Sequence, residues 1–287
     1  MHFVQAKSIL SAQNGINPYR GCTHGCIYCD SRSLCYHMNH DFEDIEVKEN
    51  APLLLDDALR RKRQHCMVGT GSMCDPYMHC EAQLKLTRRC LEAILRNGCG
   101  AAIQTKSDLI LRDLDLLKEI HKKAKCVVQI TLTTHDDDLC RLLEPNVCVT
   151  SRRFEVLMAM KEAGIPTVVW LSPTLPFIND TPENLQGLLD MCIEAEVMGI
   201  IQFGFGVTLR EGDREYFYQA LDKHFPGVKQ KYIQRYGLAY ECLSDRNEEL
   251  MRLFQTTCIT HDIMYHPDEI FAYLHAFPTH AEQMSMF

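Results

Sequence analysis

The chain has 287 residues, of which 46% are hydrophobic and 24% are charged, and its formal net charge is −8. This composition is typical of a globular protein, and the absence of any 18-residue apolar run argues against a membrane-spanning helix. The acidic balance weakens an interpretation as a DNA-gripping domain, which usually carries a basic surface. Local basic groups at 60–63, 88–89 and 122–125 are better explained as solvated helix faces.

Fifteen cysteines are a high number for a chain of this length. The first residues lack the apolar core of a secretory signal, so the cysteines do not indicate an extracellular disulfide framework. We expect reduced thiols and a cytoplasmic protein. Cys99, Cys126, Cys148 and Cys192 lie within apolar runs and are expected to be small core residues.

In chain order, residues 1–16 predict a short leader or edge strand that leads into a cysteine-rich loop at 17–30. The segment 35–40 that follows contains Cys35 and His40 and could suggest a second metal site. Its irregular spacing favours loop residues over ligands.

From residue 52 onward, short apolar strands alternate with helical patterns of 11–16 residues. This alternation predicts βαβ units and a parallel sheet, which right-handed crossovers would curl into a full or partial barrel. Helical patterns near 214–224 and 247–261 predict a C-terminal cap, so we expect a barrel over 1–212 and a cap over 213–287 within one globule. The predicted barrel elements are helices at 52–63, 83–96, 109–122, 153–163 and 182–196, and strands at 65–70, 100–105, 126–133, 166–171 and 199–204.

The loop Asn17-Pro-Tyr-Arg-Gly-Cys22-Thr-His-Gly-Cys26-Ile-Tyr28-Cys29-Asp30 places three cysteines at C-x3-C-x2-C spacing. Thiolates are soft ligands that suit zinc or iron–sulfur clusters. Zinc sites usually combine two separated ligand pairs, whereas this loop offers three thiolates and no obvious fourth. A 4Fe-4S cluster normally takes four cysteines, so three would leave one iron open to a substrate or cofactor. A structural zinc loop and a redox thiol group remain alternatives.

This spacing, with an aromatic residue before the third cysteine, resembles the signature of the radical S-adenosylmethionine (SAM) enzymes. The surrounding residues look like the branch related to spore photoproduct lyase. The resemblance implies that Cys22, Cys26 and Cys29 hold three irons of a 4Fe-4S cluster and that SAM chelates the fourth. It also implies reductive cleavage of SAM to a 5′-deoxyadenosyl radical, a reductant such as flavodoxin or ferredoxin, and an α/β fold with a partial (β/α)6 TIM-like barrel and a short helical C-terminal extension. Tyr28, as the aromatic of the signature, is expected beside the cofactor.

In α/β barrels the site lies at the C-terminal ends of the strands. The loop formed by Gly69, Thr70, Gly71 and Ser72 resembles the one that contacts the SAM amine, and the segment from Asp75 to Tyr77 resembles one common in this branch. A tight βα turn would explain the same glycines.

Period-two alternation places Gln129, Thr131 and Thr133 on one face of their strand, where hydroxyl groups would suit a ribose or the methionyl carboxylate. Threonine is also a good strand former, which is an equally simple explanation. The resemblance suggests Ser151 and Arg153 near the cofactor carboxylate, with Arg153 the stronger candidate, and a segment from Pro173 onward beside the adenine.

Cys74 lies 52 residues beyond Cys22, on a loop expected to face the cofactor. In spore photoproduct lyase a cysteine about fifty residues beyond the cluster donates a hydrogen atom, so the resemblance makes Cys74 a candidate donor. Chance placement in a cysteine-rich chain is the alternative.

The leading hypothesis is therefore a radical SAM enzyme of the photoproduct-lyase-like branch, with DNA lesions as one candidate substrate. A peptide, nucleoside or small-molecule substrate is the enzymatic alternative, favoured by the acidic charge. A non-catalytic iron–sulfur electron carrier or redox sensor is a second class, and a structural zinc protein is a third.

Overall fold

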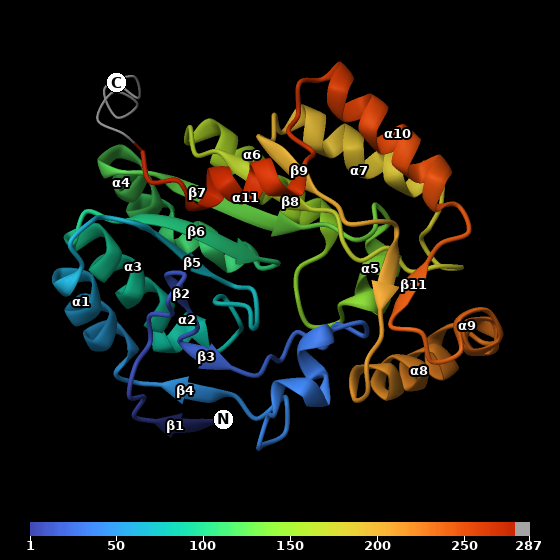
Figure 1. Ribbon diagram of the computed structural model, residues 1–287, viewed down its shortest axis with the longest axis horizontal. Helices are drawn as coiled ribbons and strands as arrows, with labels where there is room; N and C mark the ends of the chain where they lie inside the picture. The colour runs from blue at the N-terminus through green and yellow to red at the C-terminus, as the bar shows by residue number, and fades with distance from the viewer. Residues whose placement is uncertain (279–287) are drawn as a thin grey trace.

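A computed structural model describes residues 1–278 and contains one six-stranded parallel sheet (Figure 1). Its strands lie in the order β2-β5-β6-β7-β8-β9, with β2 and β9 at the two edges and not paired with each other. The sheet is therefore open, which confirms the predicted partial barrel. None of the helices within 1–278 is long and apolar enough to cross a membrane. The strands are β2 (Gly15–Ile16), β5 (Met67–Thr70), β6 (Gly100–Thr105), β7 (Cys126–Thr131), β8 (Thr167–Trp170) and β9 (Gly199–Ile201).

Helices connect successive strands and cover one face of the sheet (Figure 1). The main apolar core lies between this face and the helices, and alternate residues of β7, such as Cys126, Val128 and Ile130, point into it. The intervening residues Val127 and Gln129 face the opposite, inner side of the sheet. The covering helices are α1 (Ala51–Arg61), α3 (Leu86–Arg96), α4 (Leu114–Lys123), α6 (Thr150–Glu162) and α7 (Pro182–Glu194).

A second sheet lies beside the barrel and carries the cysteine-rich loop. It contains β1 (His2–Val4), β3 (Tyr19–Arg20) and β4 (Glu46–Lys48), in the order β1-β4-β3. The loop leaves β3, passes through the 3-10 turns η1 (Asp30–Arg32) and η2 (Leu34–Tyr36), and returns along β4.

Two predicted helices differ from the structure, and one further helix was not predicted. The helix expected at 83–96 is divided into α2 (Glu81–Leu84) and α3 at Lys85, which adopts a left-handed conformation. The Glu81 carboxylate accepts hydrogen bonds from the backbone amides of Thr87 and Arg88, so it caps α3 and favours a new helix start. The helix expected at 109–122 begins as the 3-10 segment η3 (Asp108–Asp113), and the short α5 (Asp137–Leu143) was not predicted.

The C-terminal extension is mainly helical, and both helices predicted there are confirmed as α8 (Asp213–His224) and α10 (Asn247–Thr260). It also contains α9 (Val228–Tyr236), α11 (Pro267–His275) and β11 (Glu241–Leu243), which pairs antiparallel with β10 (Gly206–Thr208).

Helix α11 covers the inner face of the sheet (Figure 1). Its Ile270 and Leu274 pack against Met67 and Val127, which lie near the amino ends of their strands. The extension therefore supplies one wall of the barrel lumen.

Candidate active site

The three cysteines of the loop line one cavity of about 100 Å3 at the carboxyl ends of the strands. Their thiol groups come from a single turn of chain, and the opposite wall comes from the segments that follow β5 and β6. The other lining residues are His24, Ser31, residues 71–75, Gln104, Thr105, Lys106 and Thr131.

Backbone contacts on both sides hold the cysteine loop in place. The amide of Cys22 donates to the carbonyl of Phe42 at 3.0 Å, and the amide of Ile27 donates to the carbonyl of Leu143 at 3.0 Å. Gly21 has a φ of +89°, and a Cβ there would overlap the Phe42 carbonyl oxygen. This position therefore requires glycine.

The electrostatics of the cavity combine buried thiols with one cation. Burial raises the pKa of the Cys22, Cys26 and Cys29 thiols, that of Cys26 to about 12. Burial alone would lower the pKa of the Lys106 ammonium, but Cys26 and Glu144 raise it above its ordinary value, so the group stays charged. Three thiols beside a half-buried cation form a donor set for a thiophilic metal centre, and binding would release the thiol protons.

Tyr28 anchors the cysteine loop to a fully buried ion pair between Glu144 and Arg153. Its hydroxyl donates to Glu144, whose other carboxylate oxygen lies 2.6 Å from Nη2 of Arg153. The Arg153 guanidinium also donates to the carbonyl oxygens of Cys148 and Thr131. Arg153 itself does not line the cysteine cavity.

Asp75 ties the loop after β5 to the end of β6. One carboxylate oxygen accepts from the Tyr77 amide at 2.8 Å and from the Thr105 hydroxyl at 2.7 Å, and the other accepts from the Lys106 amide at 2.8 Å. His24 lies 3.5 Å from the second oxygen, and burial lowers its pKa, which favours the neutral ring.

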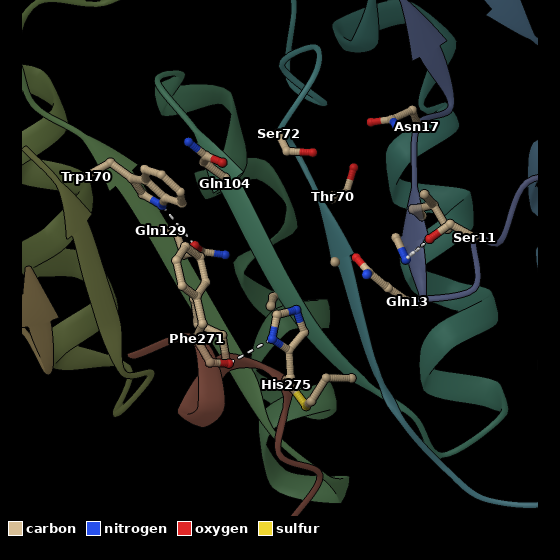
Figure 2. Close-up of a pocket in the computed structure, with 16 residues that line it drawn as sticks. Ser11, Gln13, Asn17, Thr70, Ser72, Gln104, Gln129, Trp170, Phe271 and His275 are labelled. Carbon is tan, nitrogen blue, oxygen red and sulfur yellow. Dashed lines mark hydrogen bonds between the residues drawn. The ribbon is translucent and has the colours of Figure 1, made fainter. Parts of the chain in front are cut away.

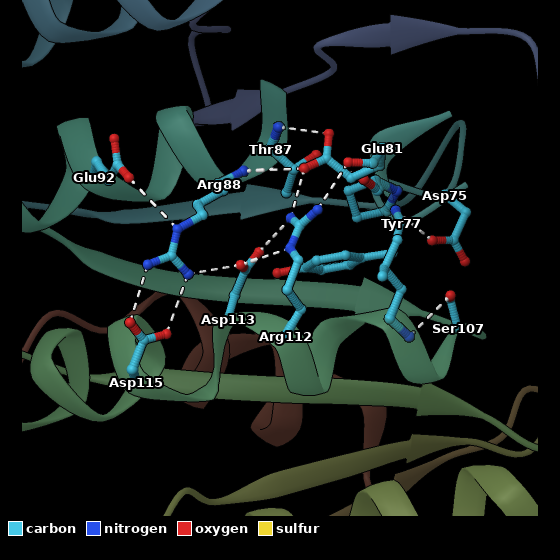
Figure 3. A network of polar contacts seen from close by, with 12 residues as sticks. Asp75, Tyr77, Glu81, Thr87, Arg88, Glu92, Ser107, Arg112, Asp113 and Asp115 are labelled. Carbon is cyan, nitrogen blue, oxygen red and sulfur yellow. Dashed lines mark hydrogen bonds and ion pairs between the residues drawn. The ribbon is translucent and has the colours of Figure 1, made fainter. Parts of the chain in front are cut away.

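A larger polar network extends this support outward (Figure 3). Arg112 pairs with Glu81 and Asp113, and Arg88 connects Asp113 to Asp115. Because Glu81 also accepts from Tyr19, the network joins α2 and η3 to the strand that precedes the cysteine loop.

The glycines after β5 have different surroundings. Gly71 has a φ of +106°, and a Cβ there would overlap the backbone of Gln104, so the loop approaches β6 as closely as only glycine allows. A Cβ at Gly69 would meet no atom within 4 Å. Ser72 and Gln104 line both the cysteine cavity and a second cavity, which makes the two adjacent.

The second cavity, of about 300 Å3, occupies the barrel lumen (Figure 2). Its polar lining consists mainly of amides and hydroxyls, and Gln129 accepts a hydrogen bond from the indole of Trp170 at 2.9 Å. No lysine or arginine of residues 1–278 lines it. The side chains that Figure 2 labels around this cavity are Ser11, Gln13, Asn17, Thr70, Ser72, Gln104, Gln129, Trp170, Phe271 and His275.

Of the remaining predicted site residues, one lines the cysteine cavity and the others do not line either cavity. Thr131 lines the cysteine cavity, and its buried hydroxyl has no hydrogen-bond partner within the described chain. Thr133 is also buried but lines neither cavity. Ser151 is exposed and bonds to Asp137, and Pro173, half-buried after β8, lines neither cavity.

Cys74 lines the cysteine cavity and donates its S–H to the carbonyl of Tyr19 at 2.9 Å. Burial raises the pKa of its thiol to about 12, so the group is protonated at neutral pH.

Sequence reasoning missed four contributors to this region. Lys106 directly follows a correctly predicted strand, so its position at a strand's carboxyl end could have drawn attention to it. His24 lies inside the cysteine motif itself. Glu144 and the α11 residue Phe271 carried no local signal, because only the folded chain brings them to the site.

A model of the radical SAM superfamily matches residues 16–192. An uncharacterized protein of Mycobacterium tuberculosis is 31% identical over 229 residues, covering 77% of this chain and 66% of that protein. An uncharacterized protein of Methanocaldococcus jannaschii is 32% identical over 179 residues, covering 62% of this chain and 66% of that protein. The chain thus spans slightly less than two thirds of the length of these relatives.

Among solved structures, a spore photoproduct lyase mutant with bound AdoMet and dinucleoside spore photoproduct has a TM-score of 0.60. The match covers 88% of this chain and 74% of that one at 14% identity, so the likeness is one of fold.

Proposed function

The chain belongs to the radical SAM superfamily, and from this premise we propose that it is an enzyme that attacks a nucleobase-containing substrate. The cofactors would be a 4Fe-4S cluster and SAM, which when bound supply reductive cleavage to a 5′-deoxyadenosyl radical. The observation that carries the proposal is the convergence of three thiols on one cavity that adjoins a polar lumen.

The residues present fit these cofactors. Cys22, Cys26 and Cys29 would be the cluster ligands, leaving one iron without a protein ligand. The unpartnered hydroxyl of Thr131 and the backbone at Gly71 offer polar contacts beside them, as a bound polar cofactor requires. Lys106 would offset part of the negative charge of the thiolates.

Arg153 is better assigned to positioning than to cofactor binding. Its donors are directed to Glu144 and to two backbone carbonyls, which supports a role in holding Tyr28 between the second and third cysteines.

The lumen lining supports a substrate group that is flat, uncharged and rich in hydrogen bonds. Gln104, Gln129 and Gln13 present amides, which can pair with base edges, and Trp170 and Phe271 present aromatic surface. The absence of lysine and arginine from the described lining implies that phosphates stay outside this cavity. A lesion in DNA is therefore the first candidate, with its base in the lumen, and a free nucleoside or a peptide is the alternative.

Cys74 is the proposed hydrogen-atom donor to the substrate radical. The raised pKa of its thiol keeps the S–H intact, and the thiol lies in the cavity that would hold the cluster. We expect Cys74→Ala to retain 5′-deoxyadenosine formation but to change the product distribution. An unchanged distribution would exclude this role.

The test is an anaerobic assay of 5′-deoxyadenosine formation by protein with a reconstituted cluster, reductant and SAM. Cys26→Ala should abolish the product, while Cys35→Ala, an exposed cysteine outside the cavity, should not. Adding ultraviolet-irradiated spore-type DNA and its unirradiated control then tests the substrate. Cleavage with repair supports the whole proposal, and cleavage without repair removes the DNA lesion. An intact cluster without cleavage would favour an electron-transfer or sensing protein.

The cellular setting belongs to the same proposal. We expect a cytoplasmic enzyme that receives electrons from a flavodoxin or ferredoxin. The division into a catalytic barrel over 1–212 and a cap over 213–287 stays a prediction.

A further inference from the structure

Three potential metal ligands meet in the small sheet, outside both cavities. His2 on β1 lies directly opposite Glu46 on β4 in the parallel register, and His40 comes from the loop that precedes β4. One candidate ligand atom from each of the three residues lies within 4.8 Å of the others. All three side chains are half-buried.

Hydrogen bonds around these residues orient both imidazole rings. Nδ1 of His40 lies 3.0 Å from the carbonyl oxygen of Asp41, and because a carbonyl only accepts, this nitrogen carries the proton. Nε2 of His40 therefore has a lone pair, and it is buried without a hydrogen-bond partner in residues 1–278. Nδ1 of His2 lies 2.9 Å from the Asp44 carboxylate, an arrangement typical of metal-binding histidines.

The neighbouring cations are engaged elsewhere, and the N-terminal ammonium of Met1 pairs with Asp44. Arg20 on β3 lies opposite Glu46, but its guanidinium donates to the carbonyls of Tyr36 and His37 at 3.1 Å. Arg20 thus fixes the turn that leads to His40, and no ion pair joins it to Glu46 within the described residues. Among the described residues, Glu46 forms no ion pair with any side chain, so its carboxylate oxygens are available to another partner.

We propose that His2, His40 and Glu46 bind one divalent transition-metal ion, with zinc the best match. Two imidazoles and a carboxylate suit zinc, and three protein ligands leave a fourth position for water. The ion would fasten the segment 40–46 to β1. Because Phe42 in this segment accepts the Cys22 amide, the site braces the cysteine loop from its outer side.

The site is separate from the thiol cavity, so its test does not depend on SAM cleavage. Cluster-loaded protein without a histidine tag is mixed anaerobically with one equivalent of Zn2+, desalted, and analysed for zinc and iron. We expect one zinc per chain. Zinc K-edge absorption should show nitrogen and oxygen at about 2.0–2.1 Å and no sulfur shell near about 2.3 Å.

The variants separate this site from adventitious binding. His40→Gln and Glu46→Gln should lower the zinc affinity at least tenfold, and Asp44→Asn should lower it about 10–100-fold by releasing the His2 ring. His261→Gln, an exposed histidine on another face, should bind zinc like the wild type. Unchanged iron content and circular dichroism establish that each variant is folded. A zinc–sulfur shell, no retained zinc in the wild type, or equal affinity in His40→Gln would overturn the proposal.

Discussion

Replacing Glu144 with glutamine is expected to lower the free energy of unfolding by about 3–5 kcal/mol. Both Glu144 and Arg153 have fully buried side chains, with Nη2 and Oε2 2.6 Å apart. Glutamine preserves the shape and can still accept from Tyr28, but it leaves the Arg153 cation without its carboxylate. The cost arises from that uncompensated buried charge rather than from a lost contact.

A double-mutant cycle isolates this charge effect. Arg153→Met alone strands the Glu144 carboxylate and should cost a similar amount, whereas the double variant removes both charges. The double variant should therefore be more stable than the sum of the single losses predicts, by about 2 kcal/mol or more. Since Tyr28 lies between two of the cysteines, the single variants should also retain less iron.

The assay is anaerobic urea unfolding of cluster-free protein followed by circular dichroism, with denaturant slopes compared among variants. Glu155→Gln on α6, the helix that carries Arg153, is the matched control, because Glu155 pairs with Arg152 at an exposed position and should show no measurable loss. Additive single losses, or a Glu144→Gln effect no larger than the control, would refute the reasoning. A loss of SAM affinity in Arg153→Met at unchanged stability would instead support direct cofactor binding.

Two further predictions concern local backbone and pH. Gly71→Ala should destabilise the protein by more than about 1 kcal/mol and reduce cluster loading, because the added Cβ would overlap the backbone of Gln104. Gly69→Ala is the control and should leave the stability to urea unchanged, since its Cβ would meet no atom within 4 Å. Equal effects of the two substitutions would contradict this reasoning. Burial raises the pKa of Asp213 from 3.8 to about 6, so the folded state binds the extra proton. Stability from this group is present below about pH 4 and is lost as pH rises through about 6, by on the order of 2 kcal/mol. In urea unfolding, the Asp213→Asn variant should lack this loss of stability with rising pH. A pH profile identical to that of the wild type would exclude Asp213 as its cause.

The barrel was predictable because its strands are continuous apolar runs between helical patterns. Each of β5 to β9 lies within a predicted strand, and the interior side of β7 followed from period-two alternation. The break at Lys85 was not predictable from local propensity, because the Glu81 side chain that caps α3 replaces the usual residue at the cap position. Helix α5 has only seven residues and too short a pattern to detect.

The cysteine cavity was predictable at the cysteine motif and at strand ends such as Ser72, Cys74 and Thr131, which line it. The cysteines share one turn of chain, so their convergence on one cavity is a local property. Arg153 shows the opposite case. The family resemblance suggested a contact with the cofactor carboxylate. The partner that holds its guanidinium, Glu144, comes from the end of α5 and has no sequence signal.

The two cavities differ in which part of the chain builds them, and this difference bears on substrate choice. Among residues 1–278, every residue that lines the cysteine cavity lies within 16–192, the region that matches the superfamily. The lumen takes Phe271, Leu274 and His275 from α11, which lies beyond that region. Shared superfamily membership therefore accounts for the cofactor chemistry, whereas the shape of the lumen, where the proposed substrate would bind, depends on the C-terminal extension. Relatives that keep the cysteine loop but differ in α11 should perform the same SAM cleavage on different substrates.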